Sequence, residues 1–439
     1  MLTVHISAEC YPAIKVGGLA DVVGSLPKYL IRSGIGAKVV IPFVENTFTQ
    51  TQELVKEHEA KFPFGSENIP YSIYKINSLD FDLYIVSIPG MFDRPSIYGY
   101  EDDNYRFLAF QIAVLQWLDT WSEKIDLIHC HDHHTGLIPF FVKYAFQFRK
   151  FAETPTVFTI HNAQYQGWMP WEIVKFFPWF EPQNASLLAW NNVVNSLAVG
   201  VKCAWKVTTV SPNYMNQLSF ASNGLEFLFQ IERAKCTGIL NGIDDTVWNP
   251  ETDTEIVYNY DVNHVEKGKA INKKEICDRF NFDEKKPLVF FIGRIVADKG
   301  ADLLGTIIWR ALQENNSQCN FLVMGSGNTQ VADGLELMKM YLNGKFNTFF
   351  GYDEKLAHQL YAGADFLLMP SRVEPCGLNQ MYSLKYGTMP IVSNVGGLND
   401  TVVDFEEKNG YGIRFLYYSI EDILFSINRA EKIFMDKNA

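Results

Sequence analysis

The loop at residues 370–382, PSRVEPCGLNQMY, combines a carboxylate with a glycine at a helix start. The apolar residues 366–369 predict a buried strand leading into the loop, and a helix is expected to begin near Gly377. The amides of Gly377 and Leu378 can then bind an anion or a hydroxyl oxygen. Glu374 can accept hydrogen bonds from hydroxyl protons. The segment is therefore a candidate site for a ligand with hydroxyl or acidic groups.

Two cations, Arg294 and Lys299, fall in a single strand-to-helix loop, where residues 288–292 predict the strand. Both side chains can reach the end of that strand, where they would hold phosphate oxygens. An Arg and a Lys on an ordinary surface are the common alternative. Their place in one loop favours the phosphate interpretation.

A third loop, KVGGLAD at residues 15–21, lies between the first expected strand and the first expected helix. Its glycines Gly17 and Gly18 let the backbone approach a ligand, and the helix start offers amides to an anion. Lys15 adds a positive charge. The pattern is neither a Walker loop nor a dinucleotide fingerprint, and an ordinary connecting loop is as compatible with it.

Residues 129–134, HCHDHH, hold four of the nine histidines. Imidazoles and a carboxylate can bind zinc or iron, which makes a metal site one interpretation. The metallo-hydrolase pattern H-x-H-x-D-H, however, has its aspartate where His133 stands, one position after Asp132. The other interpretation is a strand end that delivers Asp132 to a cleft, where it accepts hydrogen bonds from sugar hydroxyls.

Residues 159–168, TIHNAQYQGW, end another expected strand with side chains that hydrogen-bond readily. His161, Asn162 and Gln166, followed by aromatic residues, suit a polyol ligand. Polar side chains that only cap the next helix are an equal alternative from this segment alone.

These loops need strands and helices to position them. Runs of β-branched or aromatic residues predict buried strands at residues 2–7, 37–42, 83–88, 125–130, 156–160 and 206–210. A second series follows at residues 288–292, 320–324, 347–350, 366–369 and 390–393. Helical patterns lie between them, the clearest at residues 19–30, where Pro27 predicts a kink.

Alternating strands and helices predict an α/β protein with parallel sheets. We expect two Rossmann-like, doubly wound domains, residues 1–245 and 246–439, facing each other across a cleft.

Composition excludes several classes of protein. The chain has 439 residues, 47% of them apolar, and its net charge is 38 − 50 = −12. Such an acidic chain is a poor candidate for binding nucleic acid, and no apolar run is long enough to predict a membrane span. The N-terminus lacks the features of a signal peptide, and seven scattered cysteines without a Cys-x-x-Cys spacing favour the cytoplasm.

Taken together, the motifs resemble the bacterial and plant glycogen and starch synthases, retaining glycosyltransferases of family 5 with the GT-B fold. Lys15 to Leu19 stand where that family carries K-[TV]-G-G-L, and further matching segments follow in family order. They are His131-Asp132, residues 159–167, residues 210–212, residues 241–244, Arg294 with Lys299-Gly300, residues 374–380, residues 384–388 and residues 396–398. Tyr382, eight residues after Glu374, stands where many other retaining GT-B enzymes carry a second glutamate.

The resemblance implies transfer of glucose, with retention, from a nucleotide-glucose to the non-reducing end of an α-1,4-glucan. The implied catalytic residues are Asp132, His161, Glu374, Arg294 and Lys299. The implied substrate-binding residues are Lys15, Gly17, Gly18, Asp21, Asn162, Gln166, Cys376, Gly377, Leu378 and Tyr382. No metal or other cofactor is implied, because the cation pair does a metal's work on the departing diphosphate.

ADP-glucose is the donor that the resemblance implies for a chain of this length, with UDP-glucose as the alternative. A metal-dependent hydrolase built on residues 129–134 and an inactive glucan-binding homologue are further alternatives. The chain stops at Ala439 after one helical stretch, where family members usually continue through a segment that crosses back to the N-terminal domain. We therefore expect that crossing segment to be short or missing.

Overall fold

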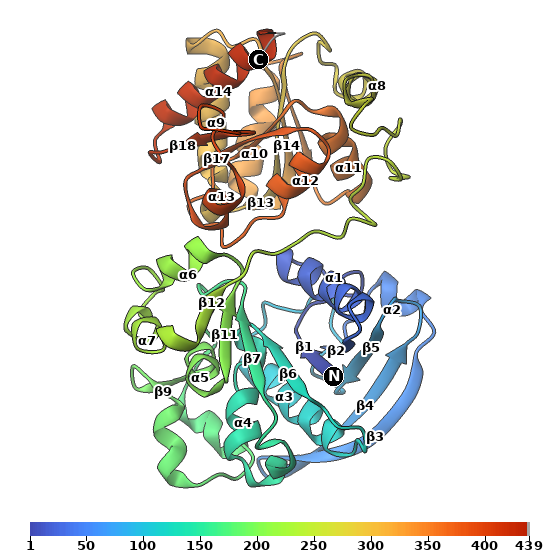
Figure 1. Cartoon of the computed structure of the whole chain (residues 1–439), viewed down its shortest axis with the longest axis vertical. Coiled ribbons are helices and arrows are strands. Elements are labelled where there is room, and N and C mark those ends of the chain that lie inside the picture. Colours follow the sequence, from blue (N-terminus) through green and yellow to red (C-terminus); the bar gives the residue numbers. More distant parts are fainter. Residues whose placement is uncertain (437–439) are drawn as a thin grey trace. The chain divides into compact units, whose positions relative to one another are not determined.

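The computed structural model describes residues 1–436. It divides into two compact units, Met1–Ile239 and Leu240–Ala439, drawn from blue to green and from green to red in Figure 1. The sequence predicted a boundary after residue 245. Each unit is an α/β domain built on its own sheet, so the predicted fold class is confirmed.

Unit 1 is built on a nine-stranded sheet whose core strands are parallel (Figure 1). The order is β12-β11-β7-β6-β1-β2-β5-β4-β3. The parallel strands are β1 (Leu2–Ile6), β2 (Gly36–Pro42), β5 (Asp82–Ser87), β6 (Leu127–His131), β7 (Thr156–Ile160), β11 (Lys206–Thr209) and β12 (Cys236–Gly238). The helices are α1 (Gly18–Arg32), α2 (Thr47–Thr51), α3 (Asp103–Asp119), α4 (Ile138–Tyr144), α5 (Ser196–Cys203), α6 (Pro212–Leu218) and α7 (Glu226–Ile231).

The sequence did not predict the antiparallel hairpin of β3 (Val55–Phe64) and β4 (Glu67–Ile76), which forms one edge of this sheet. Most of β3 is exposed and rich in Lys and Glu, so it lacks the alternation of apolar and polar residues that predicts a strand. Charged residues on an edge strand discourage pairing with another chain. A small separate sheet of β8 (Trp168–Met169), β10 (Val193–Asn195) and β9 (Ala189–Trp190) was also not predicted.

Helix α1 runs from Gly18 to Arg32 as one element, with Pro27 inside it and buried. Pro27 lacks the amide that would have bonded to the carbonyl of Val23, which is why a kink was expected. Leu19, Ala20 and Val23 lie on the buried face of this helix, and the kink at Pro27 stays a prediction.

Unit 2 contains a six-stranded parallel sheet in the order β15-β14-β13-β16-β17-β18. The strands are β13 (Leu288–Ile295), β14 (Asn320–Gly327), β15 (Phe346–Phe350), β16 (Phe366–Met369), β17 (Met389–Ser393) and β18 (Ile413–Phe415). The helices are α8 (Val265–Phe280), α9 (Ala301–Trp309), α10 (Thr329–Lys339), α11 (Glu354–Gly363), α12 (Asn379–Lys385), α13 (Gly396–Thr401) and α14 (Ile420–Met435).

The sheet of unit 2 is buried on both faces, as a doubly wound fold requires. Along β13, Leu288 and Phe290 join one hydrophobic cluster, while Val289 and Phe291 join another on the opposite face. Successive strand residues point to opposite sides, so this alternation places a core on each face.

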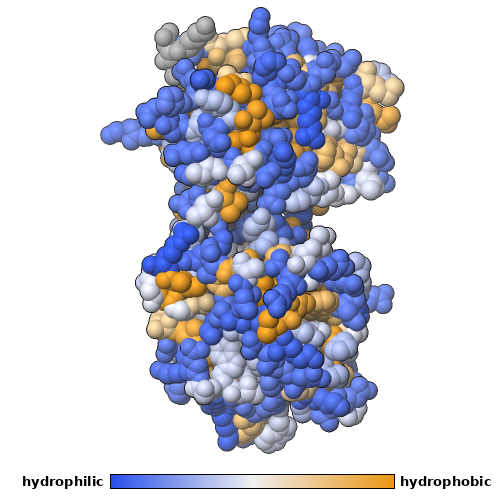
Figure 2. Space-filling model, turned by 90° about the vertical axis from the view of Figure 1, so that its right-hand side faces the viewer, coloured by the Kyte–Doolittle hydropathy of each residue, from blue (hydrophilic) through white to orange (hydrophobic). Residues whose placement is uncertain are grey.

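The surface is mainly hydrophilic on the face shown in Figure 2, where apolar residues form separate patches. Within residues 1–436, no helix combines the length and the apolar character needed to cross a bilayer.

Candidate functional site

Three neighbouring strands of unit 1 bring three predicted loops to one edge of the sheet. Strands β7, β6 and β1 lie side by side and run parallel, so their carboxyl ends share an edge. The loops that leave this edge carry Lys15, Asp132 and His161. Ligands of parallel α/β sheets bind at such edges.

Asp132 has a strained backbone, with φ 57° and ψ 178°. This region is populated mainly by glycine, and other residues found there often belong to functional sites. Its Oδ1 accepts hydrogen bonds from the amides of His161, at 2.7 Å, and Asn162, at 3.3 Å. Burial raises the pKa of Asp132 to about 7, although the two amide bonds act in the opposite direction. The carboxyl group thus joins the end of β6 to the loop after β7.

The three predicted site residues of the loop after β7, His161, Asn162 and Gln166, make different contacts. His161 is 8% exposed, and its Nε2 lies 3.0 Å from His131 Nδ1. Burial lowers the pKa of His161 to about 3, so the ring is neutral. Asn162 Oδ1 accepts a hydrogen bond from the amide of Gln164.

Gln166 is buried, and its amide holds the loop from within. Nε2 donates to the carbonyl of Ser222 at 3.0 Å, and Oε1 accepts from Asn195 Nδ2 at 2.8 Å. The Gln166 side chain therefore has a structural role in holding this loop, in addition to the role in substrate binding that the sequence predicts.

In the KVGGL loop, the amides of Val16 and Gly17 are already paired. Both donate to Glu9 Oε2, at 2.7 and 3.0 Å. The amide of Gly17 therefore bonds to Glu9 in this structure, and the predicted role of Gly17 in substrate binding stays a prediction. Helix α1 begins at Gly18, and Lys15 Nζ lies 2.9 Å from Asp21 Oδ1.

Glu9 was not predicted as a site residue. Its second oxygen, Oε1, accepts a hydrogen bond from the Tyr98 hydroxyl at 2.8 Å. Burial raises the pKa of Glu9, whereas the bonds from Val16, Tyr98 and Gly17 act against that rise. A buried acid just after the first strand was the available signal, but its partners could not be inferred from spacing.

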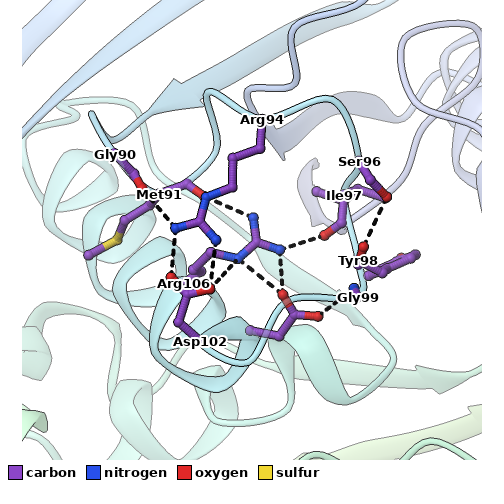
Figure 3. A network of polar contacts seen from close by, with 10 residues as sticks. Gly90, Met91, Arg94, Ser96, Ile97, Tyr98, Gly99, Asp102 and Arg106 are labelled. Carbon is purple, nitrogen blue, oxygen red and sulfur yellow. Dashed lines mark hydrogen bonds and ion pairs between the residues drawn. The ribbon is translucent and has the colours of Figure 1, made fainter.

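The loop that carries Tyr98 is held by Arg106, a buried residue of α3 (Figure 3). The guanidinium donates to the carbonyls of Met91 and Ile97, both at 2.8 Å, and to Asp103 Oδ1 at 2.6 Å. Arg94 pairs with Asp102 in the same network. The position of Glu9 thus depends on the loop that carries Tyr98, and this loop is fixed by Arg106, about one hundred residues after Glu9 in the sequence.

In unit 2, the loops after β13 and β16 pack tightly against each other. Gly300 has φ +69°, and a Cβ at this position would lie 1.9 Å from the carbonyl oxygen of Pro370. The amide of Arg372 donates to the carbonyl of Asp298 at 2.8 Å. Only glycine allows this approach, which brings the predicted cation loop onto the predicted carboxylate loop.

This packing joins Lys299 to Glu374. Lys299 Nζ lies 2.5 Å from Glu374 Oε2, and the Ser371 hydroxyl donates to the same oxygen at 3.1 Å. Arg294 lies one residue before the end of β13 and is half-buried. Within residues 1–436, its guanidinium makes no ion pair or hydrogen bond to another side chain or carbonyl.

The residues after Glu374 lead into helix α12, which begins at Asn379, two residues after Gly377 and near the predicted start. Gly377 has φ +76° and turns the chain before the helix. Cys376 is buried, and burial raises the pKa of its thiol to about 12. The Tyr382 ring stacks on Trp248 at 4.0 Å between centroids and is almost fully buried.

The histidines of residues 129–134 do not gather into the metal site that the alternative hydrolase interpretation requires. Among the described residues, the group that offers ligand atoms within 4.8 Å of one another is His5, His129 and His131. Asp132, His133 and His134 do not belong to that group in the described part of the chain. The rings of His133 and His134 instead lie against each other, 3.7 Å between centroids.

Comparison with known proteins identifies the family. The family described as "Starch synthase catalytic domain" matches residues 3–230, and "Glycosyl transferases group 1" matches residues 272–432. The chain belongs to the glycogen and starch synthase family. It is 49% identical to a glycogen synthase of Flavobacterium johnsoniae over 435 residues, which cover 99% of this chain and 92% of the relative. A glycogen synthase of Geobacillus thermodenitrificans is 37% identical, with 96% of this chain and 88% of the relative covered.

Solved structures agree. The catalytic domain of starch synthase IV from Arabidopsis thaliana, bound to ADP and acarbose, superposes with a TM-score of 0.91 at 28% identity. That match covers 100% of this chain and 92% of the other. A sucrose-phosphate synthase from Thermosynechococcus elongatus, at TM-score 0.60 and 18% identity, shares the fold. The chain is a glycosyltransferase that carries out glycogen synthase-like glucosyl transfer from a nucleotide sugar to a glucan.

Proposed function

We propose that the donor is ADP-glucose, and that Arg294, Lys299 and Glu374 form the centre of the donor site. The observation that carries the proposal is the packing of the β13 and β16 loops, which places two cations and a carboxylate at one edge of the sheet of unit 2. The relative of known structure at 28% identity was solved with ADP bound, which favours ADP over UDP as the nucleotide.

In this proposal, Arg294 and Lys299 of unit 2 hold the diphosphate of the donor. In unit 1, we propose that Lys15 and the amide of Gly18 bind substrate. When the bond between the anomeric carbon and the phosphate oxygen breaks, negative charge develops on the departing diphosphate. Fixed cations stabilise that charge in the transition state more than in the ground state, which lowers the barrier. Asp21 holds the Lys15 ammonium in place through its ion pair.

Glu374 accepts hydrogen bonds from hydroxyl groups of the glucosyl unit, and the amides of Cys376, Gly377 and Leu378 donate to its oxygens. In unit 1, we propose that Asp132 and His161, with Asn162 beside them, bind hydroxyl groups of the substrates. The 4-hydroxyl of the non-reducing glucan end attacks the anomeric carbon from the face that the diphosphate leaves. Because the attack comes from the same face, the configuration is retained. The hydroxyl proton passes to a departing phosphate oxygen.

No metal is required in this proposal, because the cation pair carries the charge that a metal would carry in other transferases. We place the reaction in the cytoplasm, where seven reduced cysteines are stable; all seven are free and buried in the structure.

The donor assay tests the proposal. The full chain is incubated with glycogen and either ADP-glucose or UDP-glucose, and both the released nucleotide and polymer-bound glucose are measured. We expect both products with ADP-glucose and a much lower rate with UDP-glucose. A faster reaction with UDP-glucose would overturn the choice of nucleotide. Glycogen binding without transfer would identify an inactive homologue, and activity that chelators abolish would contradict the metal-free mechanism.

A further inference from the structure

Four buried or half-buried histidines share one face of the unit 1 sheet. In the register of the parallel strands, His5 on β1 pairs with His129 on β6, and His131 pairs with Thr159 on β7. Residues two apart on a strand face the same way, and paired residues on neighbouring strands share a face. His5, His129, His131 and Thr159 therefore point to the same side, and His161 continues this series just beyond β7.

Three of these rings form a hydrogen-bonded chain that ends at the candidate site. His5 Nδ1 lies 3.2 Å from His131 Nε2, and His131 Nδ1 lies 3.0 Å from His161 Nε2. His5 and His131 are completely buried. His129 is not a member of the chain, because its Nε2 lies 2.6 Å from Thr159 Oγ1 instead.

The geometry fits a hydrogen-bond chain better than a metal site. The nitrogen ligands of a tetrahedral zinc are about 3.3 Å apart, given bonds of about 2.0 to 2.1 Å. The separations within the group of His5, His129 and His131 extend to 4.8 Å, and His129 Nε2 is already bonded to Thr159. The group contains no carboxylate to offset the charge of a divalent ion.

Every ring in the chain is neutral and therefore carries one proton. Burial lowers the pKa of His5 and His131 well below the usual value, and that of His161 to about 3. With one N–H on each ring, both contacts can be satisfied only if all three N–H groups point in the same direction along the chain.

The two directions differ at the far end of the chain. His5 Nε2 is buried and has no hydrogen-bond partner among the described residues. If the protons pointed away from the site, this atom would be an unpaired buried N–H group. If they point toward the site, it is an unpaired lone pair. Unpaired buried N–H groups are the rarer of the two in folded proteins.

We propose that His5 and His131 are positioning residues that hold His161 in the tautomer with its proton on Nδ1. His5 Nδ1–H donates to His131 Nε2, and His131 Nδ1–H donates to His161 Nε2. His161 then presents Nδ1–H as a donor to a hydroxyl oxygen of the glucosyl unit. This last step rests on the proposed function, whereas the tautomer itself does not.

The tautomer can be measured directly on the full chain without any substrate. The probe is protein labelled with ¹⁵N in its histidines, because long-range ¹H–¹⁵N spectra separate protonated from unprotonated ring nitrogens. We expect His161, His131 and His5 all to carry their protons on Nδ1. A histidine free in water favours the Nε2 proton, so the expected result would identify the chain as the cause. A His161 protonated on Nε2 overturns the proposal.

Substitutions separate positioning from packing. We expect His131→Leu to return His161 to the Nε2–H form and to lower kcat about tenfold, the effect of one lost hydrogen bond. His131→Gln should retain the Nδ1–H form, because its amide can still donate to His161 Nε2. His129→Leu is the matched control, because His129 lies on the same strand face but outside the hydrogen-bonded chain of histidines. It should leave the tautomer of His161 unchanged and should change kcat by no more than about twofold.

The outcomes are distinct. If His131→Leu leaves His161 in the Nδ1–H form, or if His129→Leu changes it equally, the chain does not set the tautomer. If His131→Leu does not fold, the wild-type spectrum still decides the question. If the wild-type spectrum shows the Nδ1–H form but no glucose is transferred from either donor, the proposed function fails while the chain stands.

Discussion

Lys299 and Glu374 form an ion pair with 2.5 Å between Nζ and Oε2. Glu374 is 6% exposed, so most of its solvation is replaced by Lys299 and the Ser371 hydroxyl. Both residues belong to the proposed donor site. Binding of the donor would exchange this pair for two new ones, the diphosphate with Lys299 and glucosyl hydroxyls with Glu374. The pair therefore stabilises the buried carboxylate of Glu374, and both groups can exchange partners when the donor binds.

This relationship predicts different effects on activity and on stability. Lys299→Ala should lower kcat by about 100-fold or more, because it removes a fixed charge from the departing diphosphate. It should also lower the free energy of unfolding by about 1–3 kcal/mol, because Glu374 is left buried without its cation. ADP release and urea denaturation measure the two effects.

The double variant Lys299→Ala with Glu374→Gln serves as the control. Removing the carboxylate charge should restore most of the lost stability without restoring activity. Recovery of activity in the double variant would mean that the pair is structural and that neither residue acts on the donor.

Arg294 should be as important for turnover as Lys299 but less important for stability. Its guanidinium has no ion-pair partner among residues 1–436, so Arg294→Ala breaks no such contact of the free protein. We expect kcat/KM for the donor to fall about 100-fold or more with the unfolding free energy nearly unchanged.

Arg310→Ala is the matched control for Arg294. Arg310 follows α9 in the same unit and pairs with Glu314 and Glu421 on the surface. Exposed pairs contribute about 0–1 kcal/mol to the free energy of unfolding, so stability should change little. Arg310 is not part of the proposed site, so activity should match the wild type. Equal activity of the two variants would remove Arg294 from the proposed site.

The sequence predicted the positions of the site loops because strand ends are encoded locally. The apolar runs at Thr156–Ile160 and Phe366–Met369 form strands with the predicted limits, and the polar residues after them lie at the carboxyl edges of the sheets. A hydrophobic run bounded by polar residues is enough to specify such an element.

Contacts between distant side chains could not be predicted in the same way. Glu9 and Tyr98 are 89 residues apart, and their hydrogen bond depends on how a loop held by Arg106 packs against the first strand. The helix expected near Gly377 begins at Asn379, but the positive φ of Gly377, which turns the chain before α12, could not be predicted from the helical pattern. Such details depend on the tertiary packing of each loop rather than on its own residues.

Glu9 should hold the KVGGL loop in the shape that binds the donor. Glu9→Ala leaves the amides of Val16 and Gly17 without their acceptor, which should lower the unfolding free energy by about 1–3 kcal/mol. The freed loop would place Lys15 less well, so we expect KM for ADP-glucose to rise several-fold. Initial rates at varied donor concentration measure this change.

Glu9→Gln is the informative partner of that variant, since its carbonyl oxygen can still accept from both amides. It should retain most of the stability and most of the affinity for the donor. Glu57→Ala, on the exposed part of β3, controls for loss of a carboxylate and should behave as the wild type. If Glu9→Gln is as impaired as Glu9→Ala, the charge of Glu9 matters rather than its contacts with the loop.

Acid should unfold the protein at a pH set by its buried histidines. Burial lowers the pKa of His5, His131 and His134 well below the usual value, of His129 and His133 to about 4, and of His161 to about 3. In the unfolded chain each would titrate near 6.5. Below about pH 6.5 the unfolded chain therefore binds more protons than the folded one, and stability must fall as the pH falls.

Asp132 acts in the opposite direction. Its pKa is raised to about 7 by burial, so between about pH 4 and 7 the folded protein holds a proton that the unfolded chain releases. This single group offsets part of the effect of six histidines as the pH falls. We expect Tm to decrease from pH 7 to pH 5, and to decrease more steeply in Asp132→Asn, which has no such proton to retain. Thermal melts of both proteins across this range measure the two slopes. A Tm that does not change between pH 7 and 5 would show that the buried histidines do not exclude protons from the folded state.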